Sequence, residues 1–119
     1  MKDLRWTGST LKDLKNFPDE VIDTFGFELY QVQSGRMPVS AKPMKGGHLS
    51  GVYELREDHK GDTYRTVYIA KLESAVYVLH CFQKKSPSGI RTAKTDVDLI
   101  HERLKAAQTD YEARYGKKD

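Results

Sequence analysis

Two arginines and a pair of adjacent lysines are the residues of this chain best suited to hold a phosphate. Arg56 ends one apolar segment, Arg65 lies near the start of the next, and Lys84 and Lys85 follow a third. Guanidinium and ammonium groups that converge on one point bind phosphoryl oxygens and stabilise negative charge that develops on them. We therefore predict an anion site where these segments lie side by side.

Each of these cations also has an ordinary explanation. Consecutive strand residues point to opposite faces of a sheet, so at most one of the two lysines shares a face with the arginines. The other would then be a solvated charge that protects a strand end. The arginines could pair with local carboxylates, and the candidates are Glu54, Glu57 and Asp62. Such pairing, or separation of the cations on different surfaces, would count against the phosphate site.

A reaction at a bound phosphate also needs groups that move protons. The candidates are His48 in a glycine-rich loop, His80 in an apolar segment, and one of the strand tyrosines Tyr53, Tyr64, Tyr68 and Tyr77. A histidine is more often an exposed polar residue or a buried residue whose ring nitrogens are hydrogen-bonded. A purely structural role for these histidines is therefore the alternative. The histidines lack the spacing and the cysteine partner of a zinc site. We therefore predict neither a metal nor a cofactor.

The positive charge of this chain is concentrated in two acid-free segments. The net charge of +3 is too small to imply nucleic acid by itself, but residues 29–53 and 74–95 contain no Asp or Glu. If these segments meet in space, they form a positive side that attracts a polyanion. The further basic residues expected to contact RNA are Lys42, Lys45, Lys60, Arg91 and Lys94.

Length and composition indicate one soluble domain over residues 1–119. The hydrophobic share of 38% and charged share of 31% are ordinary for such a domain. No apolar window is long enough to span a membrane, and no signal peptide follows Met1. Cys81 is the single cysteine, so no internal disulfide can form. We therefore expect a cytoplasmic protein with Cys81 buried as a small apolar residue.

The periodicity of apolar residues predicts an α+β fold in the order β-α-α-β-β-β-α. A short strand over 3–7 precedes a helical hairpin, whose second helix begins near Pro18 and stops at Ser34-Gly35. Residues 36–51 read as a loop, and strands over 51–56, 63–70 and 75–82 form an antiparallel meander. A long helix starts at Thr95, where Asp98 completes a capping box. We expect helices to cover one face of the sheet, with the basic groups on a partly open second face.

Several short sequences together resemble the RelE/ParE superfamily of bacterial toxins, and most closely its HigB-like, phage-derived branch. They are "GVYELR", "YRTVYIA", "VLHCFQKKS" and "ERLKAA", and the resemblance covers roughly residues 3–112. It implies a small antiparallel sheet packed against an N-terminal helical hairpin and a C-terminal helix. It also implies a metal-independent endoribonuclease that cuts mRNA on the translating ribosome through attack by a ribose 2′-OH. The implied partner is a helix-turn-helix antitoxin, and operator DNA is bound only through that antitoxin.

The resemblance also assigns roles to individual residues. Arg56 and Arg65 match the strand arginines that clamp phosphate, and Lys84 or Lys85 matches the basic position after the third strand. On this basis Arg65→Ala should abolish growth arrest and leave the fold intact. Many members carry a catalytic Tyr or His near the chain end, whereas "QKKSPSGIRTAK" after Phe82 has neither. The resemblance leaves His48, His80, Lys60 and Tyr64 as candidates for proton transfer, so the general base is left open. The alternative functions are a gyrase-directed ParE-like toxin and a non-enzymatic nucleic-acid-binding module.

Overall fold

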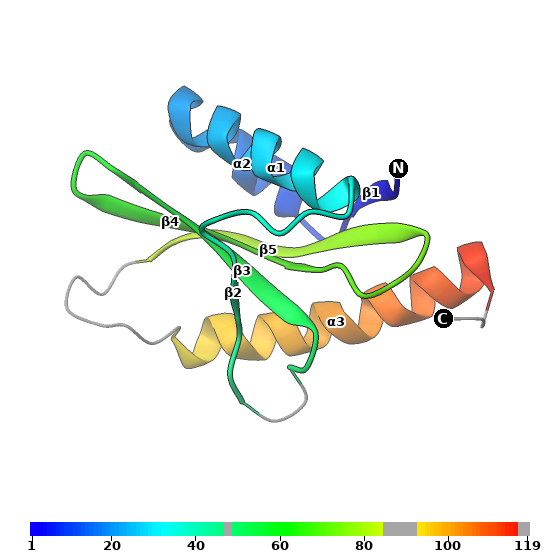
Figure 1. Ribbon diagram of the computed structural model, residues 1–119. Helices are drawn as coiled ribbons and strands as arrows, with labels where there is room; N and C mark the ends of the chain where they lie inside the picture. The colour runs from blue at the N-terminus through cyan, green and yellow to red at the C-terminus, as the bar shows by residue number, and fades with distance from the viewer. Residues whose placement is uncertain (47–48, 85–92, 117–119) are drawn as a thin grey trace.

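Five strands form one mixed sheet in the residues that the structure, a computed structural model, describes, namely 1–46, 49–84 and 93–116 (Figure 1). Across the sheet the strands are β1 (Asp3–Trp6), β5 (Ala75–Lys84), β4 (Asp62–Ile69), β3 (Val52–His59) and β2 (Lys42–Pro43). β1 runs parallel to β5, and the other neighbouring strands are antiparallel. The predicted meander is confirmed as β3, β4 and β5.

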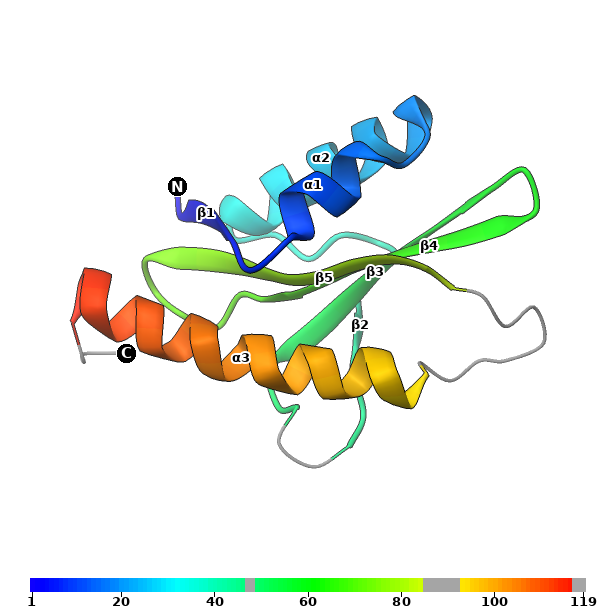
Figure 2. The ribbon, with the colours of Figure 1, turned by 180° about the vertical axis from the view of Figure 1, so that it is seen from behind.

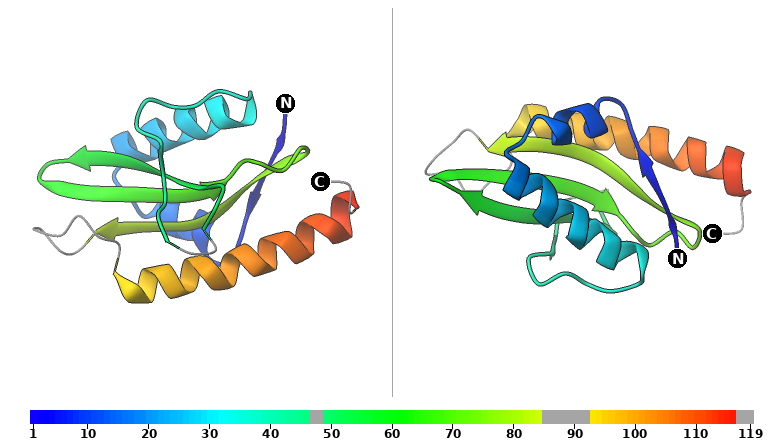
Figure 3. Two further views of the ribbon diagram at one scale, coloured as in Figure 1. Left: turned by 60° about the horizontal axis from the view of Figure 1, so that its bottom comes forward. Right: turned by 90° about the horizontal axis from the view of Figure 1, so that it is seen from above.

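Helices cover both faces of the sheet. The hairpin of α1 (Thr10–Lys15) and α2 (Asp19–Gln33) lies on one face, and α3 (Lys94–Tyr115) lies on the other, as Figures 1 and 2 show from opposite sides. The α+β class is thus confirmed, but the expectation of helices on one face only is wrong. The tip of the β3–β4 hairpin projects beyond the first turn of α3 (Figure 3), which leaves the distal part of that face outside the helix.

Two apolar cores hold these layers together. Their members come from the helix on each face and from alternate strand positions, because successive strand side chains point to opposite faces. The core under α1 and α2 includes Leu14, Val21, Phe25, Leu29, Leu55, Tyr68 and Val78. The core under α3 includes Val52, Val67, Ile69, Tyr77, Leu79, Ile100 and Leu104. Cys81 is buried in the first core, as predicted, and burial raises the pKa of its thiol to about 12.

Several boundaries differ from the sequence prediction. The charged segment 57–62 is not a loop, because β3 continues to His59 and β4 starts at Asp62. Lys60 and Gly61 form a two-residue turn, and both have the positive φ that a type I′ hairpin turn requires. Residues 36–51 contain the short strand β2. The last helix begins at Lys94 with Ala93 as its N-cap and no side-chain cap, so the capping box is wrong.

A bulge in β5 changes which of its side chains face α3. Val67 pairs with His80 and Tyr68 pairs with Val78, so Leu79 has no partner in the ladder. Odd-numbered residues of β5 before the bulge pack toward α3, and even-numbered residues do so after it. One extra residue reverses the alternation of faces for the rest of a strand.

Two glycines give a matched test of the backbone. A Cβ added at Gly26, an exposed helical position, or at Gly61 would meet nothing within 4 Å. We expect Gly26→Ala to raise the free energy of unfolding by about 0.5–1 kcal/mol, because alanine loses less backbone entropy in a helix. Gly61→Ala should lower it by about 1–2 kcal/mol, because Gly61 has a φ of 87°. Urea unfolding of both variants checks this, and shifts of the same sign would contradict the turn geometry.

Candidate functional site

Three of the four predicted phosphate-binding cations lie on one face of the sheet. Arg56 and Arg65 are direct cross-strand partners in β3 and β4. Lys84 of β5 is paired with Thr63, two residues from Arg65 along β4, so its side chain points to the same face. This is the α3 face, because Arg65 shares its side of β4 with members of the core under α3. Lys85 lies outside the described residues.

Both arginines are paired with carboxylates of the same chain. The Arg65 side chain is 6% exposed, and its guanidinium donates a hydrogen bond to Glu54, whose side chain is 15% exposed. Arg56 donates to Asp58 over 3.2 Å, in an exposed pair. The prediction that an arginine could pair with a local carboxylate is therefore confirmed for Arg65 with Glu54. Arg56 pairs instead with Asp58, which was not among the predicted partners. The candidate site therefore contains carboxylates as well as cations.

Lys84 differs from the arginines because its ammonium has no partner among the described residues. Its Nζ atom is buried and makes no hydrogen bond. Burial and the neighbouring Arg65 lower the pKa of Lys84, and Arg56 acts in the same direction. Glu54 opposes this shift, so the carboxylate and both guanidinium groups act on the same ammonium. An unpaired cation on the same sheet face as two other cations is an arrangement that an anion would stabilise.

His80 is on the same face but is held by other groups. Its Nε2 lies 2.8 Å from Asp96 Oδ1, and its Nδ1 lies 3.4 Å from a guanidinium nitrogen of Arg103. Its ring stacks on Phe82 with a centroid distance of 4.4 Å. These contacts connect β5 to α3. They favour a structural role for His80 over proton transfer, because both of its ring nitrogens already have partners.

Two other proton-transfer candidates are not on the part of the sheet face that carries this cluster. Tyr64 points to the opposite face, where its ring centroid lies 4.9 Å from that of Phe17 in the α1–α2 core. Lys60 occupies the turn at the tip of the β3–β4 hairpin. The structure therefore does not bring Tyr64 or Lys60 together with the arginines. His48 lies outside the described residues.

The additional basic residues form no single cluster. Lys42 on β2 is exposed and faces Glu54 across the strand pair, and Lys45 is exposed after β2. Lys94 pairs with Asp98 at 2.9 Å. Arg91 lies outside the described residues. The two acid-free segments do not lie side by side in the sheet, because β3 and β4 separate β2 from β5.

Glu54 has a larger role in the structure than the sequence predicted. The sequence indicated only that its carboxylate could pair with one of the arginines. The spacing of "ELR" could have shown more, because Glu54 and Arg56 are two residues apart on one strand and so share a face. What the sequence could not show is that the carboxylate crosses to Arg65 of the next strand and leaves one oxygen, Oε2, buried without a partner.

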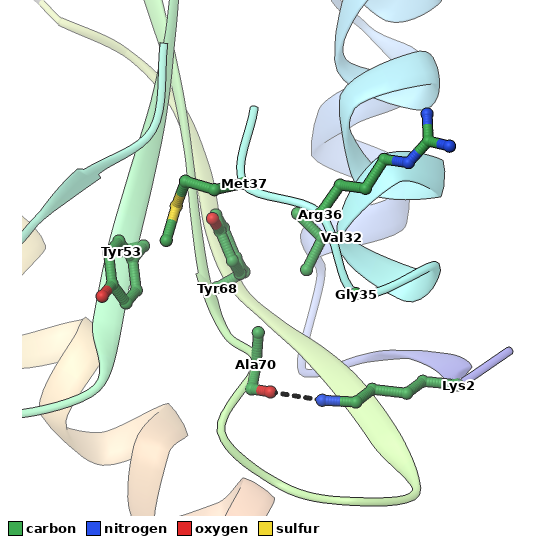
Figure 4. Close-up of a pocket in the computed structure, with 8 residues that line it drawn as sticks. All are labelled: Lys2, Val32, Gly35, Arg36, Met37, Tyr53, Tyr68 and Ala70. Atoms are coloured by element: carbon green, nitrogen blue, oxygen red, sulfur yellow. Dashed lines mark hydrogen bonds between the residues drawn. The ribbon is translucent and has the colours of Figure 1, made fainter. Parts of the chain in front are cut away.

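A small pocket lies on the other side of the molecule (Figure 4). Its lining includes Val32, Met37, Tyr53 and Tyr68, and the Lys2 ammonium at its edge donates to the Ala70 carbonyl oxygen over 2.6 Å. The pocket therefore offers an apolar surface rather than a free cation, and we do not assign the phosphate site to it. Within the three described ranges, no His, Cys, Asp or Glu side chains gather in a way that could hold a metal ion.

Comparison with protein families assigns the chain to a class. Residues 12–105 match the family described as phage derived protein Gp49-like (DUF891), and the chain belongs to this family. The family is associated with toxin–antitoxin systems. No curated protein and no solved structure matches the chain. Among the described residues, no helix combines the length and the apolar character needed to cross a membrane.

Proposed function

We propose that this protein is the toxin of a type II toxin–antitoxin pair, in the HigB-like branch of the RelE/ParE superfamily. We further propose that it cleaves mRNA on the translating ribosome, and therefore acts in the cytoplasm. The observation that carries the proposal is the Arg56–Arg65 cross-strand pair with Lys84 on the same sheet face. Membership of a toxin–antitoxin-associated family supports the class of protein.

The proposed reaction is attack of a ribose 2′-OH on the adjacent phosphorus. Negative charge grows on the phosphoryl oxygens, and the P–O5′ bond breaks to give a cyclic phosphate and a 5′-OH. Arg65 would bind the phosphoryl oxygens in the buried part of the site, and Arg56 would bind them from its exposed edge. Lys84 would donate a proton to the leaving oxygen, a role that suits an ammonium whose pKa is lowered.

An antitoxin would find apolar surface on the helical hairpin. Phe27 and Tyr30 are three residues apart on α2, and they are 62% and 54% exposed, respectively. Residues three apart lie on one side of a helix, so the two rings form a continuous contact surface. We propose that the helix-turn-helix antitoxin covers this hairpin and reaches the cations with acidic groups. Binding to operator DNA would then occur only through the antitoxin.

A coupled translation assay tests the proposed activity. Purified protein is added to a translating extract, and the message is examined by primer extension. We expect new 5′ ends in the presence of translating ribosomes and none when initiation is blocked. An intact message under active translation would remove the nuclease from consideration.

A second candidate is a toxin or binding module that cleaves nothing. The pairing of both arginines with carboxylates of the same chain favours it, because paired guanidinium groups are less available to a phosphate. Inhibition of DNA gyrase in a supercoiling assay, with intact message, would identify a ParE-like toxin. Normal growth after induction without any antitoxin would identify a non-enzymatic nucleic-acid-binding module.

A further inference from the structure

Three buried polar atoms without hydrogen-bond partners belong to residues of the candidate site. They are Glu54 Oε2, Arg65 Nε and Lys84 Nζ, each unpaired among the described residues. A buried polar atom without a hydrogen bond costs about 1–3 kcal/mol, so such atoms are rare in folded proteins and need an explanation. Two of these three atoms are donors and one is an acceptor. A ligand that offers both an acceptor and a hydroxyl donor would satisfy all three.

Glu54 has the geometry of a positioned proton acceptor. One carboxylate oxygen, Oε1, accepts a hydrogen bond from the Arg65 guanidinium, which fixes the orientation of the group. The other oxygen, Oε2, is buried and makes no hydrogen bond. A general base must be held within hydrogen-bond reach of the proton that it removes, and a carboxylate anchored through one oxygen meets this requirement.

The other acid–base groups on this face are already engaged. Both oxygens of Asp58 are used, because Thr63 and Arg56 donate to Oδ1 and Arg56 also approaches Oδ2. Both ring nitrogens of His80 face the charged partners Asp96 and Arg103. Within the described ranges, Glu54 is therefore distinguished from the other carboxylates of this face because one of its oxygens is held by Arg65 and the other is buried without a hydrogen bond.

We propose that Glu54 is the catalytic base of the proposed reaction and that its substrate group is a ribose 2′-OH next to a phosphodiester. This inference rests on the proposed function and identifies the general base, which the sequence did not assign. Oε2 takes the proton of the 2′-OH, the 2′-oxygen forms the new bond to phosphorus, and the P–O5′ bond breaks. The leaving O5′ takes a proton from the Lys84 ammonium. Solvent then carries a proton from the Glu54 carboxylic acid to the Lys84 amine and restores the starting state.

The same geometry explains why a cation site contains a carboxylate. In the free protein Glu54 holds Arg65 in place and reduces its unpaired charge. When a phosphoryl group enters the site, the buried and unpaired donor Nε of Arg65 can bind it while the contact to Glu54 Oε1 is kept. Arg65 therefore both orients the base and contacts the phosphate, which links proton removal to the bond that forms.

Glu54→Gln separates catalysis from binding. Glutamine keeps the shape and an oxygen that can accept from Arg65 but cannot take the proton. We expect primer-extension cleavage on translating ribosomes to fall by about 10²–10⁴-fold. Co-sedimentation with ribosomes programmed with a fully 2′-O-methylated message should stay at the wild-type level or rise.

Two further variants complete the experiment. Glu57→Gln removes a carboxylate from the same strand, but on the opposite face, and should cleave as the wild type does. Glu54→Asp keeps the carboxylate and should cleave faster than Glu54→Gln. Wild-type cleavage by Glu54→Gln, or a parallel loss of cleavage and ribosome binding, would overturn the assignment of Glu54. If the wild type itself does not cleave, the proposed function fails and this inference fails with it.

Discussion

Replacing Arg65 with alanine is expected to abolish growth arrest and also to destabilise the protein. The side chain is 6% exposed and paired with Glu54, so its removal leaves a largely buried carboxylate without its cation. Breaking a buried ion pair from one side costs about 3–5 kcal/mol, a large part of the 5–15 kcal/mol that typically holds a domain folded. The sequence alone suggested that this substitution would leave the fold intact, and the burial of Arg65 changes that expectation. Urea unfolding measures the loss.

Arg65→Lys separates the catalytic effect from the stability effect. Lysine keeps the charge beside Glu54, so the free energy of unfolding should stay closer to the wild-type value. It cannot present the planar, paired donors of a guanidinium to a phosphoryl group, so cleavage should still fall by at least about tenfold. The double variant Arg65→Ala with Glu54→Ala should be more stable than Arg65→Ala alone, because it removes the unpaired carboxylate. Growth arrest by Arg65→Ala at the wild-type level would exclude Arg65 from the site.

Replacing Lys84 with methionine is expected to remove activity while stabilising the fold. Methionine fills a similar volume and eliminates a buried ammonium that makes no hydrogen bond within the described residues. We expect the free energy of unfolding at neutral pH to rise by about 1 kcal/mol, the lower end of the cost of an unsatisfied buried group. Cleavage should fall by about 10²–10³-fold, because the variant loses a donor aimed at the reacting group. This opposite movement of stability and activity is typical of a functional residue.

The pH dependence of stability provides an independent check on Lys84. Its pKa in the folded protein lies below the usual 10.5, because burial and Arg65 disfavour the ammonium. Between these two pKa values the unfolded chain binds more protons, so the wild-type protein gains stability as the pH rises. Below the folded-state pKa the destabilisation is fully present. The stability advantage of Lys84→Met should therefore shrink as the pH approaches 10.5.

An exposed lysine provides the control for these measurements. Lys12 lies on α1, on the other face of the sheet, and is exposed. Lys12→Met should change the free energy of unfolding by less than about 0.5 kcal/mol at any pH and leave cleavage unchanged. If Lys84→Met behaved like Lys12→Met in both assays, Lys84 would be an ordinary surface charge.

The sequence by itself determined the elements and the identity of the cations. The β-branched and aromatic residues of "TYRTVYIA" and "AVYVLHCF" predicted β4 and β5, and helical spacing of Phe25, Leu29 and Val32 predicted α2. These patterns are local, because each reflects the period of one helix or strand against a core. The register of Arg56 against Arg65 was not predicted, because the sequence placed the strand ends at residues 56 and 63, whereas the strands continue to the two-residue turn at Lys60-Gly61.

Only the tertiary structure decided which side chains share the site. The bulge at Leu79 reverses the alternation of β5 and brings Lys84 to the face of the arginines, and nothing in the spacing of "VLHCFQKK" marks that extra residue. The pairing of Glu54 with Arg65 depends on the register between two strands, and the placement of α3 decides that His80 is held by Asp96 and Arg103. The physical reason is that a side chain's position on a face and its partners depend on contacts between segments distant in the sequence. The spacing of apolar residues indicates only whether one segment forms a helix or a strand.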